Sequence, residues 1–549
     1  MTILTLNKKE LEKRVGKLTE ELKDKITEMG TPIDGETDEE LMIEVFPNRP
    51  DLLSLQALSS ALLNYTEKTK PKDYKIEKPE KDFLVTIDKS VKKVRPHTVC
   101  AIVKNLKLDD QRIKDIIDLQ EKLHLTIGRK RKKLAIGIYP LEKIKLPIKY
   151  EARKPSEIKF QPLESQVVMT APQILKQHPT GKEYSDLLKG EEVYPIFVDA
   201  NNQILSMPPI INSHETGRVS EETKDVFIEC SGFNLHYLNK TLNIIVTALS
   251  DMGGKIYSMK IKSSEETHTT PNLESEKMEF EVKDINKTLG TDFTEKQIKN
   301  YLEKMGIGLL KEKNKTFAVI PAWRTDMLHW IDLTEEVAIA HGYENFTAKI
   351  PQISTIGEEA KKSIRQKMLA NILVGIGLLE TSTFHLTTKE NIKKMHYSLN
   401  DFIEIVESKN ENDTLRIDLL TNLLKVLSEN SDSQYPQKIF EIGTVFELDK
   451  EGKTETGILE KERLAITLID EKVNFTEAKQ VLDYLFRMLD KEYELEEVED
   501  NNYILGRVGK ILVNKKEVGR IGEIAPRVLK NWKISLPVSS IEMDLGFLD

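Results

Sequence analysis

The sequence predicts a multidomain α+β protein, and three observations carry this prediction. The chain has 549 residues, enough for about three to five separate cores. Two distant stretches, 11–52 and 285–327, share one helix–strand pattern. Residues 355–549 alternate helical patterns with strand-like runs joined by polar turns, which favours an antiparallel sheet flanked by helices. We therefore expect two small related units, a large mixed α/β region between them, and a C-terminal sheet domain.

The two small units share a specific order of signals. In both, a glycine-led helical pattern ends in Met-Gly and is followed by a strand, a proline and the motif Arg-x-Asp. The equivalent positions are Met29-Gly30 and Met305-Gly306, Arg49 and Arg324, and Asp51 and Asp326. Only the second copy adds further acids downstream. We expect one scaffold used for two purposes, and the alternative is chance similarity between two small units.

Shifts in composition and periodicity set the expected domain boundaries. The segments are, in order, the first small unit (1–65), a linker (66–82), the large mixed domain (83–262), a second linker (263–275), the second small unit (276–352) and the sheet domain (355–549). Both linkers are polar and lack an apolar period.

Bulk composition excludes several classes of protein. Charged residues make up 31% and hydrophobic residues 39% of the chain, and no apolar run approaches the roughly 18 residues that span a bilayer. A net charge of −9 argues against coating nucleic acid by overall charge. Two cysteines, Cys100 and Cys230, cannot form a disulfide framework, and the N-terminus has no secretory or transit pattern. We expect a cytoplasmic protein without a membrane segment.

One basic run stands out in the large domain. Arg129, Lys130, Arg131, Lys132 and Lys133 follow a helical stretch and precede a strand-like one, so they lie in a loop. A phosphate backbone could reach such a loop. The alternative is a solvated turn.

The acids of the second unit form a candidate cation site. Asp332, Glu335 and Glu336 stand at i, i+3 and i+4, so they share one face of a helix, and Asp326 lies six residues upstream. Convergent carboxylates suit Mg²⁺. Asp332-x-x-Glu335 is also a capping-box pattern at a helix N-terminus, and this alternative stays open. The two Arg-x-Asp motifs either bind a phosphate or carboxylate or bridge within each unit.

A polar loop in the large domain is a second candidate site. It holds Asn212, Ser213, Glu222, Thr223 and Asp225 between a Pro-Pro entry and an apolar strand. Hydroxyl, amide and carboxylate groups in one loop can bind an amino acid or position a hydrolytic water, and the alternative is a solvated loop that caps its neighbours. The sequence has no GxxxxGK[ST] loop, no GxGxxG, no HExxH and no Gly-x-Ser-x-Gly motif.

Five blocks in sequence order resemble the β subunit family of phenylalanyl-tRNA synthetases, of the archaeal and eukaryotic cytosolic type. They are residues 46–62, 123–138, 208–232, 321–346 and 415–448. The resemblance covers nearly the whole chain. It implies two small helix-turn-helix-like units, a large editing domain, and a class II synthetase-like antiparallel domain without catalytic motifs.

The resemblance also implies function. Aminoacylation with ATP would occur on a separate α subunit in an α2β2 heterotetramer, and this chain would contribute assembly, tRNA(Phe) contacts and hydrolytic editing of Tyr-tRNA(Phe). Mg²⁺ would bind Asp326, Asp332, Glu335 and Glu336. Asn212, Ser213, Glu222, Thr223 and Asp225 would form the editing loop as a group.

Two departures from the family pattern concern editing. Relatives usually read Ile-Gly-x-His-Asp where this chain has Gly137-Ile138-Tyr139-Pro140, and Thr-Gly-Thr-Asp where it has Ser231-Gly232-Phe233-Asn234. If the His-Asp pair lines the pocket, editing here is weakened. The rival hypotheses are a non-catalytic tRNA-binding or assembly scaffold with a decayed editing site, and a hydrolase that acts alone on mischarged tRNA.

Overall fold

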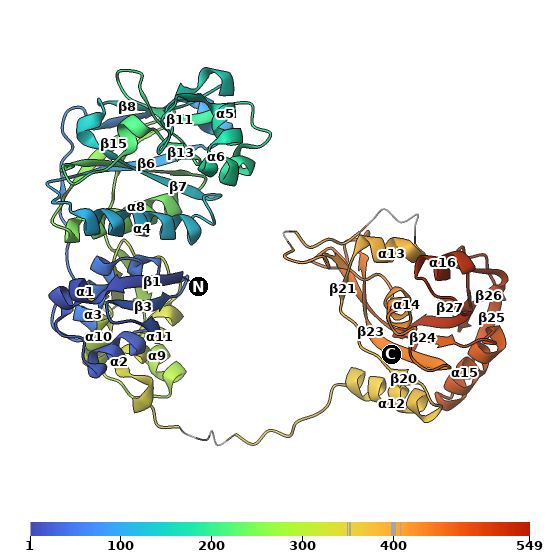
Figure 1. Ribbon diagram of the computed structural model, residues 1–549. Coiled ribbons are helices and arrows are strands. Elements are labelled where there is room, and N and C mark those ends of the chain that lie inside the picture. The colour runs from blue at the N-terminus through green and yellow to red at the C-terminus, as the bar shows by residue number, and fades with distance from the viewer. Residues whose placement is uncertain are drawn as a thin grey trace. The chain divides into compact units, whose positions relative to one another are not determined.

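The computed structural model describes residues 2–313, 315–348, 350, 353–396, 402–406 and 408–548 (Figure 1). Contacts divide the chain into two units, Met1–Ile350 and Pro351–Asp549. Across the described ranges, every helix is too short or too polar to cross a membrane.

The repeated sequence pattern corresponds to a repeated fold. The first copy consists of β1 (Thr2–Asn7), α1 (Lys8–Val15), α2 (Glu20–Glu28), β2 (Ile33–Glu36), β3 (Glu40–Val45) and α3 (Leu55–Tyr65). The second consists of β17 (Glu276–Phe280), α9 (Val282–Leu289), α10 (Glu295–Lys304), β18 (Gly308–Glu312), β19 (Lys315–Ile320) and α11 (Trp330–His341). The antiparallel sheet orders, β1-β3-β2 and β17-β19-β18, also correspond. The expected duplication is therefore confirmed.

The glycines of the shared motif end helices for one physical reason. Gly30 and Gly306 have φ of +91° and +77°, a left-handed conformation that costs glycine little. At the other end of these helices, Thr19 and Thr294 cap α2 and α10 through their side chains. The glycines that lead the two helical patterns of the sequence are Gly16 and Gly290, and helices α2 and α10 begin after them, at Glu20 and Glu295.

The large domain of the first unit is built on one strongly curled sheet. Its helices are α4 (Asp110–Leu125), α5 (Ala171–Gln177), α6 (Pro179–Tyr184), α7 (His214–Gly217) and α8 (Leu235–Asp251). Its strands are β4 (Ile76–Glu77), β5 (Leu84–Ile87), β6 (His97–Lys104), β7 (Leu134–Pro140), β8 (Ile148–Arg153), β11 (Tyr194–Val198), β12 (Ile204–Met207), β13 (Ile211–Asn212), β14 (Val226–Gly232), β15 (Lys255–Lys262) and β16 (Thr267–Thr270), with a separate pair β9 (Lys159–Phe160) and β10 (Met169–Thr170). Helices α4 and α8 cover one face of β6, β14 and β7 (Figure 1).

The expected linkers are partly structured. Residues 66–82 include β4, which pairs with β15, and residues 263–275 include β16, which also pairs with β15. In β16, the buried Thr270 hydroxyl donates to the carbonyl of Cys100 at 2.6 Å and accepts from its N–H at 3.0 Å. This non-local pairing gives the polar sequence a buried role that composition cannot indicate. Cys100 and Cys230 are both free and buried.

The second unit is a seven-stranded sheet between two layers of helices. Its elements are α12 (Lys361–Gly375), β20 (Leu379–Glu380), β21 (Leu386–Thr387), α13 (Lys389–Met395), β22 (Thr414–Leu415), α14 (Leu420–Glu429), β23 (Gln437–Leu448), β24 (Ile458–Ile469), α15 (Phe475–Met488), β25 (Glu494–Glu497), β26 (Tyr503–Val513), β27 (Lys516–Ile524), α16 (Pro526–Asn531) and β28 (Val538–Asp544). The order is β20-β23-β24-β28-β27-β26-β25, antiparallel except for β20 beside β23. Helices α12 and α15 pack on one face, and α13, α14 and α16 on the other.

A buried arginine organises the end of this sheet. Arg416 is 2% exposed, and its Nε donates to the Thr444 carbonyl at 2.8 Å while Nη1 donates to Glu441 at 2.6 Å. Gly443 leaves room for the guanidinium, since a Cβ there would lie 2.4 Å from Nη2. This contact joins the segments around Arg416 and Glu441, which lie in the same sequence block, 415–448.

Candidate functional site

The acidic cluster of the second small unit is built around Arg324. This side chain is 2% exposed. Its Nε and Nη2 donate to the two oxygens of Asp326 at 2.8 and 2.7 Å, and Nη2 and Nη1 donate to Glu336 at 2.8 and 3.2 Å. Burial works to raise the pKa of Asp326, but the hydrogen bond and charge of Arg324 outweigh it and hold that pKa below its usual value. Two of the four predicted Mg²⁺ ligands therefore bind a guanidinium.

The other two carboxylates differ from each other. Asp332 accepts the backbone N–H groups of Leu328 and His329 at 2.8 and 2.7 Å, which caps the N-terminus of α11. Glu335 is exposed, and its pKa is raised by partial burial and by the negative charges of Glu336, Asp332 and Asp326. The cluster thus retains a negative potential. Among the residues that the structure describes, no three acids, histidines or cysteines are grouped as metal ligands.

The first copy repeats the arginine–aspartate pair without the additional acids. Arg49 Nε and Nη2 donate to Asp51 at 3.0 and 2.9 Å, and Asp51 is 4% exposed. The interpretation of this motif as an internal structural bridge is confirmed. The two copies also touch: the Tyr65 hydroxyl donates to the Ile339 carbonyl at 3.2 Å.

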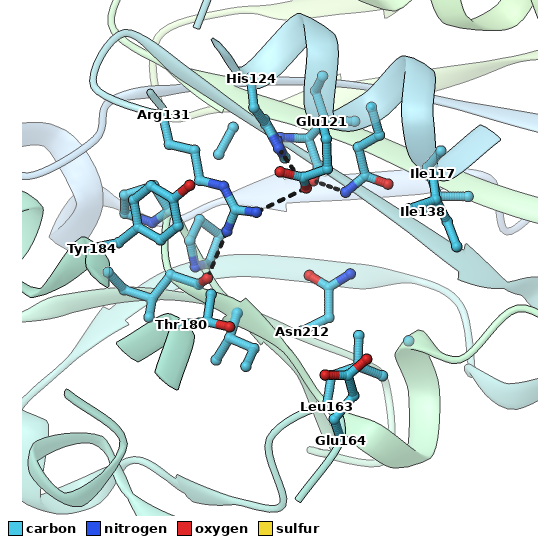
Figure 2. A pocket seen from close by; sticks show the side chains of 18 of the residues that line it. Ile117, Glu121, His124, Arg131, Ile138, Leu163, Glu164, Thr180, Tyr184 and Asn212 are labelled. Atoms are coloured by element: carbon cyan, nitrogen blue, oxygen red, sulfur yellow. Dashed lines mark hydrogen bonds and ion pairs between the residues drawn. The ribbon is translucent and has the colours of Figure 1, made fainter. Parts of the chain in front are cut away.

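The large domain contains a cavity of about 890 Å³. Figure 2 shows its walls, which come from α4, β7, α6 and the loop around β13. The lining combines apolar side chains such as Ile117, Ile138 and Leu163 with nearly as many polar ones, which include Glu121, His124, Arg131, Glu164, Glu183, Asn212, His214, Arg218 and Glu229. A concave site in which apolar walls carry convergent polar groups is typical of small-ligand recognition.

One wall of the cavity carries a connected triad of polar side chains. His124 Nε2 accepts the Ile136 N–H at 2.8 Å, so Nδ1 carries the proton and faces Glu121 at 3.2 Å. Burial lowers the pKa of His124 and keeps it neutral. Arg131 donates to Glu121 and to the Ile210 carbonyl, each at 2.9 Å, and stacks on Tyr184 (Figure 2).

A second polar group of the cavity wall centres on Glu229. This side chain is 2% exposed, lines the cavity, and has one oxygen, Oε2, without a hydrogen-bond partner. Burial raises its pKa to about 8, so the carboxyl is protonated at neutral pH. Beside it, the Tyr139 hydroxyl lies 2.8 Å from Ser206 Oγ and 3.3 Å from both Asn212 Oδ1 and Glu229 Oε1.

Gly137 leaves room for this group. A Cβ at Gly137 would lie 2.2 Å from the Tyr139 hydroxyl and 2.6 Å from Glu229 Oε1. The Tyr139 position that departs from the family pattern thus takes part directly in the hydrogen bonds of the cavity wall.

The structure does not bring the five predicted loop residues together. Asn212 lines the cavity, and Ser213 is buried beside it. Glu222 is exposed, Thr223 accepts the Ser220 N–H at 3.2 Å, and Asp225 accepts the Asn105 N–H at 2.9 Å, all outside the lining.

Sequence reasoning missed Glu121, His124, Arg131 and Glu229 as cavity residues. A carboxyl within the apolar strand Val226–Gly232 was the available signal for Glu229. Likewise, Glu121 and His124 stand at i, i+3 on the helix before the basic run.

Comparison with known proteins defines the class. Three family models match successive parts of the chain: the B3/4 domain over residues 80–246, the tRNA synthetase B5 domain over 278–343, and the phenylalanyl tRNA synthetase beta chain CLM domain over 347–545. A chain with these three parts is a tRNA synthetase chain.

Relatives cover nearly the full length. The phenylalanine–tRNA ligase β subunit of Pyrococcus abyssi is 41% identical over 91% of this chain and 89% of its own, and that of Archaeoglobus fulgidus is 35% identical over 100% and 98%. An N-terminal fragment of the Pyrococcus horikoshii phenylalanyl-tRNA synthetase β subunit aligns with a TM-score of 0.59 and 36% identity, over 62% of this chain and 99% of the fragment. The chain belongs to the family of phenylalanine–tRNA ligase β subunits.

Proposed function

We propose that the chain is the β subunit of a cytoplasmic α2β2 phenylalanine–tRNA ligase, in which the α subunit attaches phenylalanine to tRNA(Phe) with ATP. The observation that carries this proposal is the match to β subunits over 91% of the chain, with all three domain models in order. Copurification with the cognate α subunit, followed by a charging assay, tests it. The rival, a non-catalytic scaffold, requires that a folded pair does not charge tRNA.

An exposed apolar helix face supports α-subunit docking. On α12, Ile364, Met368 and Val374 are 53%, 44% and 53% exposed, and they lie on the side opposite the buried Leu369 and Leu373. Apolar side chains gathered on one exposed face are typical of protein interfaces. We assign this face of the second unit to contact with the α subunit.

The cavity of the large domain supports an editing role. An aminoacylation site shaped for phenylalanine discriminates weakly against one additional hydroxyl, so a second, hydrolytic site improves fidelity. We propose that the cavity receives the tyrosyl group of Tyr-tRNA(Phe). Water would then attack the ester carbonyl, the ester bond would break, and tyrosine and the tRNA 3′ hydroxyl would leave.

We assign phenol recognition to Glu229 and Asn212. The protonated Glu229 carboxyl belongs to the cavity lining and its buried Oε2 has no hydrogen-bond partner, so a bound ring whose hydroxyl reached this oxygen would satisfy it where phenylalanine leaves it unpaired. His124 is a positioning residue, because both ring nitrogens are already used by Ile136 and Glu121. The division into a first small unit (1–65), editing domain (83–262), second small unit (276–352) and class II-like domain (355–549) remains part of this proposal.

Removal of the Glu229 carboxyl is expected to impair editing. Glu229→Ala should lower kcat/KM for tyrosine release from Tyr-tRNA(Phe) by about 10- to 100-fold, because the phenol loses its partner. Glu229→Gln is the matched control, since an amide resembles the protonated acid and should retain most activity. The measurement is release of labelled tyrosine by the α–β complex. Parental release by the alanine variant would contradict the assignment.

The same site predicts a pH dependence. Glu229 is protonated below about pH 8 and ionised above it, so parental tyrosine release should fall as pH rises through about 8. The glutamine variant cannot ionise there and should lack this decrease. An identical pH profile for both proteins would show that Glu229 does not control the step.

The Mg²⁺ assignment to Asp326, Asp332, Glu335 and Glu336 stays a prediction. The negative potential at Glu335 supports it, and the engagement of Asp326 and Glu336 with Arg324 supports the structural alternative. If Mg²⁺ binds, Glu335 is the carboxylate available to hold it, and the ion would neutralise the acids of this unit. If the acidic cluster holds no Mg²⁺, the Mg²⁺ that the complex uses acts with ATP.

A calorimetric titration separates these alternatives. Glu335→Gln should weaken Mg²⁺ binding by about tenfold or more, the scale that even an outer partner of a metal site contributes. Glu344→Gln, an exposed acid of the same unit, is the control. Equal Mg²⁺ affinity in both variants would show that Glu335 does not hold Mg²⁺. The acids of the cluster would then serve only to cap the helix and to pair with the arginine.

A further inference from the structure

We propose that Phe233 and Tyr237, with the cations of the loop 129–133, form a binding surface for the single-stranded 3′ end of tRNA at the rim of the editing cavity. This surface, here called the aromatic platform, rests on the proposed editing function. Phe233 and Tyr237 are 52% and 43% exposed, although aromatic side chains are usually buried.

Strand register places the aromatic and basic segments side by side. Gly232, the last residue of β14, pairs with Leu134, the first residue of β7. A Cβ at Gly232 would lie 2.4 Å from the Lys133 carbonyl, so the two backbones approach closely. The basic loop before β7 and the aromatic segment after β14 consequently emerge at the same sheet edge.

Cations contact both rings. The Arg95 guanidinium lies 5.4 Å from the Phe233 ring. The same guanidinium donates a hydrogen bond from Nη2 to the Ser231 carbonyl at 2.8 Å. The Lys133 ammonium lies 5.6 Å from the Tyr237 ring. Asn234 caps α8 and fixes the turn between the rings by accepting the N–H groups of residues 236 and 237. The rings are therefore held in place while part of their surface faces solvent.

The local charge is strongly positive in a chain whose net charge is −9. Residues 126–140 include five cations and no acid, and residues 230–250 include no acid. Arg129, Lys130 and Lys133 are exposed. Exposed rings stack on bases, and neighbouring cations attract the phosphate backbone, so this combination fits a single-stranded nucleic acid.

The position of the aromatic platform next to the cavity indicates which ligand it binds. Arg131 belongs to the same basic loop, yet it lines the cavity and bonds to Glu121. A strand that carries an aminoacyl ester into the cavity beside Arg131 would lie next to this loop. The single-stranded 3′ end of tRNA has the required chemistry, because its unpaired bases can stack and its ester lies at the terminus.

The test uses the α–β complex and tRNA(Phe) with 2-aminopurine in its single-stranded 3′ end. Stacking on the platform should quench the fluorescence. Phe233→Ala/Tyr237→Ala should abolish the quenching and raise Kd by about 5- to 150-fold, the range for loss of one stacked base. Tyr343→Ala, an aromatic 62% exposed beside the acidic cluster, is the matched control and should change neither.

Further arms keep the proposal falsifiable. Lys130→Ala/Lys133→Ala should reduce the slope of log Kd against log salt by about 0.7 per cation. In the charging assay, the platform variant should show a raised KM for tRNA(Phe) and a parental kcat, because the proposed defect is in tRNA binding. Quenching that persists in that variant, or an equal loss of affinity for tRNA without its single-stranded end, would overturn the platform. If the parental complex quenches the 2-aminopurine fluorescence but releases no tyrosine from Tyr-tRNA(Phe), the editing function is refuted and the aromatic platform is supported.

Discussion

Replacing Met368 by aspartate is expected to weaken association with the α subunit by about 30- to 700-fold. The reason is that a buried, unpaired charge at the centre of an apolar interface costs about 2–4 kcal/mol. Met368 is 44% exposed on α12 and has Ile364 one turn before it. Charging activity should fall in proportion to the complex that is lost, and analytical ultracentrifugation measures the association directly.

The control for this variant is the same substitution on another helix. Met488, at the end of α15, is 52% exposed and lies outside the α12 face, so Met488→Asp should associate normally. Circular dichroism should be unchanged in both variants, because both positions are exposed. Equal association of the two variants would exclude α12 from the interface.

Removal of the Arg324 side chain is expected to lower the free energy of unfolding of the first unit by about 3–5 kcal/mol. Arg324→Ala leaves Asp326 and Glu336, whose side chains are 6% and 5% exposed, without their positive partner. Two of the three tryptophans, Trp323 and Trp330, flank this cluster, so urea unfolding followed by tryptophan fluorescence reports on it.

The pH dependence of this effect has a definite sign. The pKa of Asp326 is lowered in the folded protein, so the pair contributes stability above the unfolded value of about 3.9 and loses it as pH falls. The difference in the free energy of unfolding between the parent and Arg324→Ala should therefore become smaller in acid. Lys315→Ala, which breaks an exposed pair with Glu279, should cost at most about 1 kcal/mol at any pH. If Arg324→Ala lowered the free energy of unfolding by a similarly small amount, this result would contradict a buried structural network around Arg324.

The sequence predicted those features that depend on local chemistry. Gly30 and Gly306 end helices because of their own backbone conformation, and each Arg-x-Asp motif closes within three residues. These signals suffice to find the duplication. The long strands Gln437–Leu448 and Tyr503–Val513 also correspond to strand-like runs bounded by polar turn residues in the sequence of 355–549.

The cavity could not be predicted in the same way. Glu121 and Glu229 face one space from segments more than a hundred residues apart, and their elements meet because α4 packs on β7 and β7 pairs with β14. The loop that the sequence favoured contributes Asn212 to the lining, whereas Thr223 and Asp225 bond within turns. The polar residues 267–270 have the composition of a linker, and only their non-local pairing with β15 makes them a strand.

The charging assay tests the central claim, that this chain is one half of a two-subunit ligase, most directly. Labelled phenylalanine, ATP, Mg²⁺ and tRNA(Phe) are supplied to the chain alone, to the cognate α subunit alone, and to both together. We expect charging only when both are present, and reduced charging when Met368→Asp replaces the parent. Charging by this chain alone, or no charging by a folded and associated pair, would contradict the account.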